Sequence, residues 1–395
     1  MANDAAALRG NWNYPTSMRF GVGRIKELPD ACKQLGFKKP LLVTDPGLAK
    51  LPMIQEALAS LKAAGLQAGL FADIKGNPVS KNVEDGLKVF RDGGYDGIIA
   101  FGGGSALDAA KAIALMAGQK RPMWDFEDVG DNWTRVDPKG IVATIAVPAT
   151  SGTGSEVGRA SVITNEATHT KKIIFHPKML PSIVISDPAL TVGLPPHVTA
   201  ATGMDALAHC LEAYCAPGFH PMADGIAVEG MRLVKVSLTT AVKDGKNLVA
   251  RANMMVAASM GATAFQKGLG AIHSLSHPVG AVYDTHHGLT NAVVMPYVLE
   301  FNREAIEEKM VRLAAWLGLP NPSFKSVMSW VIALRKEIGI PHTLKDIGVG
   351  SERIDELSEM AAVDPTAGSN PVPAGAPEMK KMFIASIEGR LAQNA

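Results

Sequence analysis

The sequence has little of what would direct a chain to an oxidising compartment or a membrane. It contains only three cysteines, Cys32, Cys210 and Cys215, and so small and odd a number suits a reducing compartment rather than a disulfide framework. Its first residues, MANDAAALRGNWNYPT, lack the apolar core of a signal peptide, and no run of about 18 apolar residues offers a membrane span. We therefore expect a soluble, cytoplasmic protein without a membrane partner.

An excess of charge of one sign is also absent. The chain carries 39 Lys and Arg against 38 Asp and Glu, for a formal net charge of +1, and it has no run of five like charges. This balance argues against a surface for nucleic acids or anionic membranes. A hydrophobic content of 47% with 19% charged residues is typical of a folded globular protein, and 395 residues suggest two domains.

Short strands and helices alternate in the first half of the chain. Apolar runs such as PLLVTD (40–45) and DGIIAFGG (96–103) predict buried strands, and the segments between such runs have helical periodicity. This alternation predicts a Rossmann-like, doubly wound parallel sheet. Long helical stretches dominate after Leu194-Pro195-Pro196, which we expect to be the domain boundary. The predicted architecture is an α/β domain over residues 1–194 followed by an all-helical domain over residues 195–395.

Histidines are concentrated in one segment of the predicted helical domain. The stretch 268–288, GLGAIHSLSHPVGAVYDTHHG, contains four of the ten histidines: His273, His277, His286 and His287. Upstream, Asp205 and His209 stand four positions apart and would share one face of a helix, as would His273 and His277. Imidazole nitrogens and a carboxylate oxygen form a site for a divalent metal such as Fe²⁺ or Zn²⁺. Histidines buried for structural reasons are the alternative, which the upstream Asp-xxx-His pair disfavours.

Two glycine-rich loops follow predicted strands of the α/β domain. Gly102-Gly103-Gly104-Ser105 opens a helix, where glycines let the backbone approach a pyrophosphate and the helix N-terminus binds its charge. The second loop is PATSGTGSE (148–156). Asp45 ends an earlier strand, where a carboxylate can accept hydrogen bonds from an adenosine ribose. The structural alternatives are a tight strand-to-helix turn at the first glycine loop and an acidic turn residue without a ligand at Asp45. Two such loops in one domain nevertheless favour a dinucleotide site.

These motifs, in this order, resemble those of the iron-containing (group III) alcohol dehydrogenases. They are GGGSALDAAK (102–111), PATSGTGSE (148–156), DPALTVGLPP (187–196), GMDALAHCLEAY (203–214) and GLGAIHSLSHPVGAVYDTHHGLTNAVVMP (268–296). The resemblance covers essentially the full length of the chain. It implies a metal- and NAD(H)-dependent oxidoreductase that has a Rossmann-like α/β domain and an all-helical metal-binding domain.

The resemblance implies a role for each matching position of the histidine segment and of the upstream Asp-xxx-His pair. Asp205, His209, His273 and His287 fall on the family's four metal ligands, and His287 is chosen because it directly precedes Gly288. His277 falls on the histidine near the nicotinamide, which makes it a catalytic proton relay. The implied cofactors are NAD and Fe²⁺, and Zn²⁺ suits the same ligand set.

The resemblance also implies cofactor contacts in and beside the two glycine loops. The matching positions are Asp45, Asn77, Gly103, Gly104, Ser105, Asp108, Thr150, Ser151, Thr153 and Lys171. Asp at position 45 goes with a preference for NAD in this family, whereas a small residue goes with NADP. The implied mechanism is hydride transfer to or from NAD, with the metal acting as a Lewis acid on the substrate oxygen.

The substrate pocket is where the sequence departs from the family pattern. The cysteine of the family's DVCTGGNPR motif is replaced by Thr366 in the segment DPTAGSNPV, and Phe265 precedes the histidine segment. The helical motifs are most similar to the branch that contains 4-hydroxybutyrate dehydrogenase. Arg159 or Lys267 could bind a substrate carboxylate, although either could instead form a structural salt bridge. We therefore predict a small primary alcohol or ω-hydroxy acid, such as 4-hydroxybutyrate, and its aldehyde as substrates.

Three other functions are compatible with this sequence. The first is a general short-chain alcohol or diol dehydrogenase without a preference for carboxylates, and the second is a lyase similar to dehydroquinate synthase. The third is a catalytically silent regulatory protein on the same fold, which loss of a ligand or of the GGGS loop would favour; both are present. The family commonly assembles as dimers or larger oligomers, so the resemblance also implies a homo-oligomer.

Overall fold

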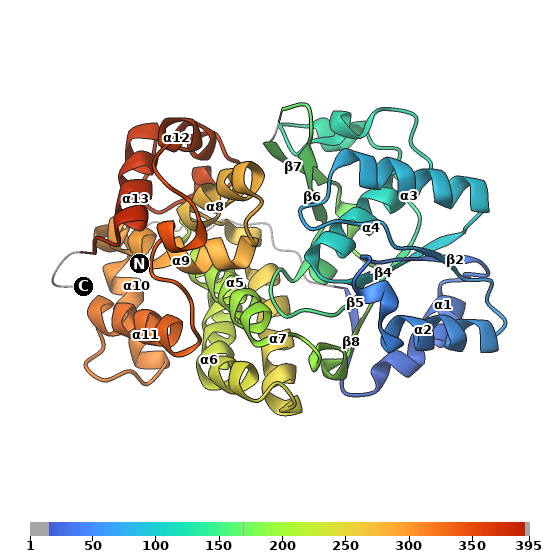
Figure 1. The fold of residues 1–395 in the computed structure, drawn as a ribbon, viewed down its shortest axis with the longest axis horizontal. Helices are drawn as coiled ribbons and strands as arrows, with labels where there is room; N and C mark the ends of the chain where they lie inside the picture. Colours follow the sequence, from blue (N-terminus) through green and yellow to red (C-terminus); the bar gives the residue numbers. More distant parts are fainter. Residues whose placement is uncertain (1–15, 169, 392–395) are drawn as a thin grey trace. The chain divides into compact units, whose positions relative to one another are not determined.

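The computed structural model describes residues 16–168 and 170–391 (Figure 1). These residues form two compact units. The α/β unit contains residues 16–150 and 154–193, and the helical unit contains residues 151–153 and 194–391. The three residues 151–153 of the second glycine loop thus group with the helical unit, although both neighbouring segments belong to the α/β unit.

A six-stranded parallel sheet is the centre of the α/β unit (Figure 1). Its strands lie in the order β1-β8-β5-β4-β2-β3, and every neighbouring pair is parallel. Their bounds are β1 Ser17–Phe20, β2 Pro40–Val43, β3 Gly69–Phe71, β4 Gly97–Gly102, β5 Thr144–Pro148 and β8 Ile183–Ser186. The predicted doubly wound parallel sheet is therefore confirmed. An antiparallel hairpin of β6 (Ala160–Asn165) and β7 (Thr170–Phe175) is an addition that the alternating pattern does not predict.

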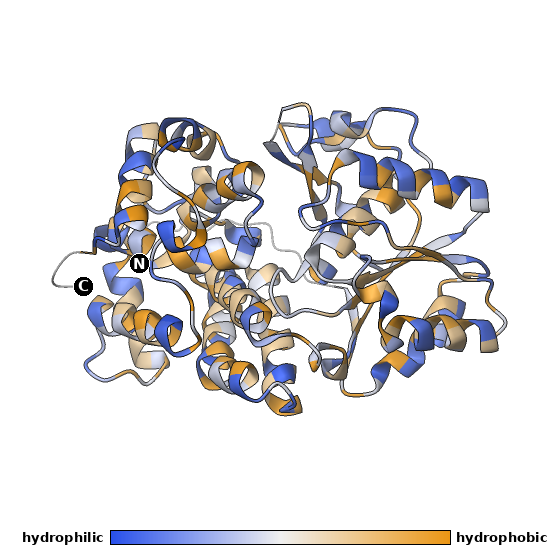
Figure 2. Ribbon diagram, viewed as in Figure 1, coloured by the Kyte–Doolittle hydropathy of each residue, from blue (hydrophilic) through white to orange (hydrophobic). Residues whose placement is uncertain are grey.

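Both faces of this sheet are buried against helices. Leu41 of β2 belongs to the same apolar cluster as side chains of α3 and α4, whereas its neighbour Leu42 belongs to the cluster that contains α1 and α2. This alternation with a period of two residues explains why the strands read as continuous apolar runs. The α3 helix alternates hydrophobic and hydrophilic residues, as expected for a helix with one solvent-exposed face (Figure 2). The helices are α1 Leu28–Gln34, α2 Pro52–Ala63, α3 Ser80–Gly93 and α4 Gly104–Met116.

All regular secondary structure in the described part of the helical unit is helical. The helices are α5 Pro196–Cys215, α6 Pro221–Lys243, α7 Leu248–Ala264, α8 Ala271–Tyr283, α9 His287–Phe301, α10 Arg303–Trp316, α11 Phe324–Glu337, α12 Ile354–Ala362 and α13 Ala376–Glu388. The central helix is α5, which packs against α6, α7 and α9 and is buried at every residue from Thr199 to Cys215. Polar side chains on α5 therefore need partners inside the protein.

One stretch of the described residues, Leu248–Lys267, is long and apolar enough to cross a membrane by length and composition alone. It comprises α7 and the short helix Phe265–Lys267, and 61% of its most apolar window is buried inside the protein. A helix that is apolar around most of its circumference is expected in the core of an all-helical unit. Burial in the core of the helical unit therefore explains why this stretch is apolar.

Candidate active site

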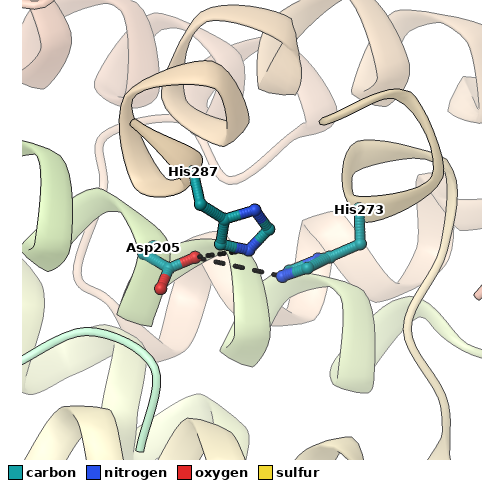
Figure 3. Close-up of side chains that lie close together, drawn as sticks. All are labelled: Asp205, His273 and His287. Atoms are coloured by element: carbon teal, nitrogen blue, oxygen red, sulfur yellow. Dashed lines mark ion pairs between the residues drawn. The ribbon is translucent and has the colours of Figure 1, made fainter. Parts of the chain in front are cut away.

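Three donor atoms from three helices of the helical unit converge on one point. Asp205 of α5, His273 of α8 and His287 of α9 each offer one ligand atom, and these atoms lie within 4.8 Å of one another (Figure 3). The Oδ1 atom of Asp205 is 3.9 Å from Nε2 of His273 and 3.6 Å from Nε2 of His287. Asp205 and His273 are almost fully buried, whereas the side chain of His287 is 23% exposed. Two imidazoles and a carboxylate at this spacing are suited to a divalent first-row metal. We call these three metal-binding side chains, Asp205, His273 and His287, the donor group.

A glycine and a helix cap bring His287 to this point. A Cβ atom at Gly288 would lie 2.5 Å from the carbonyl oxygen of Ala201 and 3.0 Å from Cβ of Asp205, so only glycine lets α9 start this close to α5. The preceding residue, His286, is the N-cap of α9, and its Nδ1 accepts a hydrogen bond from the N–H of Leu289. The structure thus gives His286 a capping role, which the sequence left unassigned.

A buried carboxylate holds His273 in place. Glu212 of α5 contacts Nδ1 of His273 through Oε2 and accepts the N–H of Ile272 through Oε1 at 2.7 Å. Because a carboxylate oxygen can only accept, Nδ1 carries the proton and Nε2 is directed to the donor group. Burial lowers the pKa of His273, but Glu212 and Asp205 outweigh it and raise the pKa above its usual range.

The fourth predicted ligand, His209, lies beside the group of three. Its ring stacks on that of His273 at a centroid distance of 4.7 Å, and its Nε2 is 3.9 Å from Oδ1 of Asp205. Burial lowers the pKa of His209 to about 4, so the ring is neutral at pH 7. Its buried Nδ1 has no hydrogen-bond partner among the described residues. A neutral, buried imidazole with an unpaired Nδ1 at this place fits a fourth metal ligand. Phe265, a predicted substrate residue, packs against the His209 ring at 5.1 Å between ring centroids.

A second buried carboxylate holds His277. Its Nδ1 lies 2.8 Å from Oδ2 of Asp364, and its ring stacks on His287 at 5.4 Å between centroids. Burial raises the pKa of Asp364, but the electrostatic attraction of His277, together with hydrogen bonds from His277 and Thr366, outweighs burial and lowers the pKa below its usual value. The carboxylate is therefore charged. His277 therefore lies beside the donor group in a fixed orientation, although it is not part of that group.

Thr366, predicted to be a substrate residue, is engaged by the protein. Its hydroxyl donates to Oδ1 of Asp364 at 2.6 Å and lies 2.9 Å from the hydroxyl of Ser274 on α8. Thr366 thereby attaches the segment after α12 to the helix that carries both His273 and His277. In this structure it supports the orientation of Asp364.

The two predicted carboxylate-binding cations differ in their partners. The side chain of Lys267 is only 2% exposed and forms an ion pair with Asp224, so its charge is balanced inside the helical unit. Arg159 lies in the α/β unit, where its guanidinium is 5.6 Å from the centroid of the Phe175 ring. Burial lowers the pKa of Arg159, and the charge of nearby Asp128 offsets this lowering only in part. Arg159 is therefore the less fully neutralised of the two.

The predicted nucleotide loops lie at the carboxyl ends of adjacent strands in the α/β unit. Asp45 follows β2, Gly103 to Ser105 follow β4, and Thr150 follows β5. These strands are neighbours in the sheet, and the chain reverses its direction of winding between β2 and β4. Carboxyl ends at such a switch point are where open parallel sheets bind dinucleotides.

The backbone of the first loop requires glycine. Gly102 has a φ of +152°, and a Cβ atom there would lie 2.8 Å from that of Ala106. Gly103 is the N-cap of α4, so the first amides of α4 are available to an anion. Nearby, Oδ1 of Asp45 accepts the N–H groups of Gly47 and Leu48, both at 2.9 Å. These two bonds fix the carboxylate at the strand end.

The carboxylate of Asp108, a predicted cofactor contact, is bonded within the protein. Its carboxylate accepts hydrogen bonds from the Ser155 hydroxyl and from the N–H of Val162, and it pairs with Lys111 at 3.3 Å. Lys111 is 1% exposed and donates to the carbonyl oxygens of Ser155 and Ala160. Asp108 and Lys111 therefore join α4 to the second loop and to β6, and a cofactor contact at Asp108 stays a prediction.

The remaining predicted cofactor positions are divided between the two units. In the α/β unit, the ammonium of Lys171 donates to Oδ1 of Asn77 at 2.8 Å, so these two predicted contacts are brought together. Ser151 and Thr153 belong to the short segment of the helical unit, where Gly152 packs against Thr202 of α5. The predicted cofactor positions therefore do not all belong to one unit, and their contact with a cofactor stays a prediction.

Three residues of the site were missed by reasoning from the sequence. Glu212 lies seven positions after Asp205 on the same face of α5, and Asn291 lies four positions after His287 on α9, so helical spacing could have indicated both. Asp364 has no such signal, because 87 positions separate it from His277.

Comparison with known proteins agrees with this geometry. The profile of a family described as iron-containing alcohol dehydrogenase matches residues 15–188. A second profile, for the C-terminal part of the Fe-containing alcohol dehydrogenase family, matches residues 199–387. The two matches together cover nearly the whole chain.

Individual relatives match over almost their full length. A 4-hydroxybutyrate dehydrogenase from Cupriavidus necator is 38% identical over 384 residues, which cover 95% of this chain and 99% of the relative. An NAD-dependent methanol dehydrogenase from Bacillus methanolicus is 37% identical, with 91% of this chain and 95% of the relative covered. The crystal structure of a 1,3-propanediol oxidoreductase has a TM-score of 0.91 at 36% identity and covers 95% of this chain and 99% of its own.

Proposed function

The chain belongs to the iron-containing alcohol dehydrogenase family, and we propose that it interconverts a small ω-hydroxy acid, such as 4-hydroxybutyrate, with its aldehyde. It is an oxidoreductase that acts on alcohols. The convergence of Asp205, His273 and His287 from three helices is the observation that carries the chemistry. The relative that acts on 4-hydroxybutyrate, similar over 95% of the chain, supports the substrate class.

We propose that Asp205, His209, His273 and His287 hold a divalent metal, with Fe²⁺ as the native ion and Zn²⁺ as the alternative. A metal in this site supplies Lewis acidity, which lowers the pKa of an alcohol and polarises a carbonyl. The α/β unit would hold NAD(H), which supplies or accepts the hydride. The first amides of α4 would bind its pyrophosphate, and Asp45 would accept hydrogen bonds from the adenosine ribose.

The chain's own contribution to proton transfer would come from His277. Its Nδ1 is held by Asp364, so Nε2 is the nitrogen that can accept or donate a proton. Glu212 has the corresponding role for His273, whose Nε2 is a proposed metal ligand. Two histidines one helical turn apart are thus assigned different tasks, although each is held by a carboxylate.

The substrate carboxylate would be bound by Arg159. The ion pair with Asp224 already balances the charge of Lys267, which makes that residue the weaker candidate. A general short-chain alcohol or diol dehydrogenase is the second candidate function. It is favoured by the similarity to dehydrogenases of methanol and of 1,3-propanediol, whose substrates have no carboxylate.

We also propose that the protein is cytoplasmic and forms a homodimer or larger homo-oligomer. All three cysteines are buried free thiols, which supports a reducing compartment. Oligomer formation rests on the resemblance to the family alone.

A substrate panel with NAD(H) tests the proposal. The metal-loaded enzyme would be assayed with 4-hydroxybutyrate, butanol, ethanol and 1,3-propanediol. We expect kcat/KM for 4-hydroxybutyrate to exceed that for butanol by ~10-fold or more, which corresponds to ~1.4 kcal/mol. Arg159→Ala should raise KM for 4-hydroxybutyrate and leave that for butanol unchanged. Arg121→Ala, which removes a 59% exposed guanidinium of the same unit, is the matched control.

The outcomes separate the candidates. A preference for butanol would identify a general alcohol dehydrogenase and remove Arg159 from the site. An unchanged KM for 4-hydroxybutyrate in Arg159→Ala would show that another group binds the carboxylate. Absence of turnover with every substrate and with both metals would favour the silent regulatory protein.

A further inference from the structure

The buried amide of Asn291 contacts all three atoms of the donor group. Asn291 lies on α9, one helical turn after His287, and its side chain is fully buried. Its Nδ2 lies 2.8 Å from Oδ1 of Asp205, 3.1 Å from Nε2 of His287 and 3.2 Å from Nε2 of His273. These are the three residues whose ligand atoms form the proposed metal site.

The orientation of this amide follows from its partners. The carboxylate oxygen of Asp205 can only accept a hydrogen bond, so the nitrogen of the Asn291 amide must face it. The amide oxygen of Asn291 is buried and has no hydrogen-bond partner among the described residues. Asn291 therefore acts as the hydrogen-bond donor toward Asp205, His273 and His287. The two hydrogens on its Nδ2 atom are shared among these three acceptors.

These hydrogen bonds use electrons that a metal would also need. An imidazole ring nitrogen that accepts a hydrogen bond has a single lone pair. In the neutral ring of His273, which is the form that binds a metal, Glu212 holds the single proton on Nδ1 and the lone pair of Nε2 is directed at Asn291. The same lone pair cannot bind an N–H group and a metal ion together. A carboxylate oxygen has further lone pairs, so the bond from Asn291 to Asp205 can persist when a metal binds.

We propose that Asn291 competes with the metal for the two histidines. Its amide holds the ligands of α5, α8 and α9 together without an ion, and it releases His273 and His287 as the ion enters. This inference rests on the proposed metal site. Two consequences follow from the competition. Removing the N–H groups of Asn291 should speed metal uptake and strengthen binding, because no hydrogen bond to the histidines has to break. It should also destabilise the metal-free protein, because Asp205 loses a hydrogen bond in a buried place.

The experiment measures metal uptake by the full-length protein and requires no turnover. Protein stripped of metal by a chelator would be mixed with Zn²⁺ at pH 8.5, and uptake would be followed against a chromophoric competitor. In Asn291→Leu, which has a similar size and no donor, we expect uptake to be at least fivefold faster, with a lower dissociation constant and a lower metal-free melting temperature. Asn291→Ala provides the same comparison if the leucine variant does not fold.

A matched control separates this effect from the loss of any asparagine hydrogen bond. Asn253→Leu removes the bond from Asn253 to the Ser237 hydroxyl on neighbouring helices of the same unit. It should lower the melting temperature and leave metal uptake unchanged. Uptake that is slower, weaker or unchanged in both Asn291 variants would overturn the proposal. If the wild-type chain binds no Zn²⁺, the proposed metal site itself fails, which is a different result.

Discussion

In the α/β unit, many of the atoms proposed to contact the cofactor belong to the backbone. In the helical unit, by contrast, all the atoms proposed to bind the metal belong to side chains. Glycine at positions 102 and 103 lets the strand end and the start of α4 present their amides. In the helical unit, His273 and His277 are each held by a carboxylate from another segment, Glu212 and Asp364. The first arrangement depends on chain geometry and the second on long-range hydrogen bonds.

This difference indicates how each unit should respond to substitution. A side chain that ligates a metal cannot be replaced by its neighbours, and a carboxylate that orients such a ligand acts on it directly. A backbone site tolerates changes of side chain unless the change closes the loop or removes a specific contact such as Asp45. We therefore expect the larger losses of activity from single substitutions in the helical unit.

The largest effect is expected for Asp205→Ala. This substitution removes the only carboxylate of the donor group, together with its hydrogen bond from Asn291. A loss of several kcal/mol of transition-state stabilisation corresponds to a fall in kcat/KM of ~10³-fold or more. Steady-state kinetics and metal analysis of the purified variant measure it. Asp355→Ala, which removes a 76% exposed carboxylate of the same unit, is the control. Activity close to wild type in Asp205→Ala would place the chemistry elsewhere.

The next effect distinguishes the two supporting carboxylates. Glu212→Gln leaves the shape of the side chain and removes the charge that holds His273, so metal affinity should fall by roughly 10- to 100-fold. Asp364→Asn makes the same change beside His277, which is outside the donor group. It should lower kcat and alter its pH dependence, while metal affinity stays unchanged. Equal losses of metal affinity in both variants would contradict the separation of roles.

Much of the fold and the donor group could be predicted because the relevant signals are local. Alternating strands and helices predicted the parallel sheet, since each strand is buried on both faces and reads as one apolar run. The spacing of four between His273 and His277 placed both on one face of α8. The glycine at 288 proved decisive for a reason that only the structure shows, namely the approach of α9 to Ala201.

The remaining features could not be predicted because they depend on partners far away in the sequence. Lys267 is predicted to bind substrate, and its ion pair with Asp224, 43 positions earlier in the sequence, makes it the weaker of the two candidates. Asp108 matches a cofactor loop, yet the structure directs its carboxylate to Ser155 and Lys111. Whether a charged side chain faces a ligand or a neighbour is decided by tertiary packing, which a motif does not encode.

A smaller effect, in the α/β unit, is expected at Asp45. Asp45→Ser removes the carboxylate proposed to accept hydrogen bonds from the ribose and to repel a 2′-phosphate. The ratio of kcat/KM for NAD to that for NADP should fall by about tenfold, or ~1.4 kcal/mol, while kcat with NAD changes little. Asp92→Ser, which removes a 64% exposed carboxylate on α3, should leave the ratio unchanged. An unaltered ratio in Asp45→Ser would exclude Asp45 from the ribose site.

The smallest effect concerns stability at alkaline pH and compares the two units directly. Burial raises the pKa of Cys32 in the α/β unit, and of Cys210 and Cys215 in the helical unit, to about 12 from 9.0. Above pH 9 the unfolded chain loses these protons while the folded chain keeps them, so the free energy of unfolding falls as pH rises. The loss between pH 9 and pH 10 is about 1 kcal/mol per thiol. Urea unfolding under reducing conditions should show this loss reduced by one thiol's share in Cys210→Ala and in Cys32→Ala. A pH dependence that neither variant changes would mean that other groups determine alkaline stability, and that the helical unit gains no extra sensitivity from its second thiol.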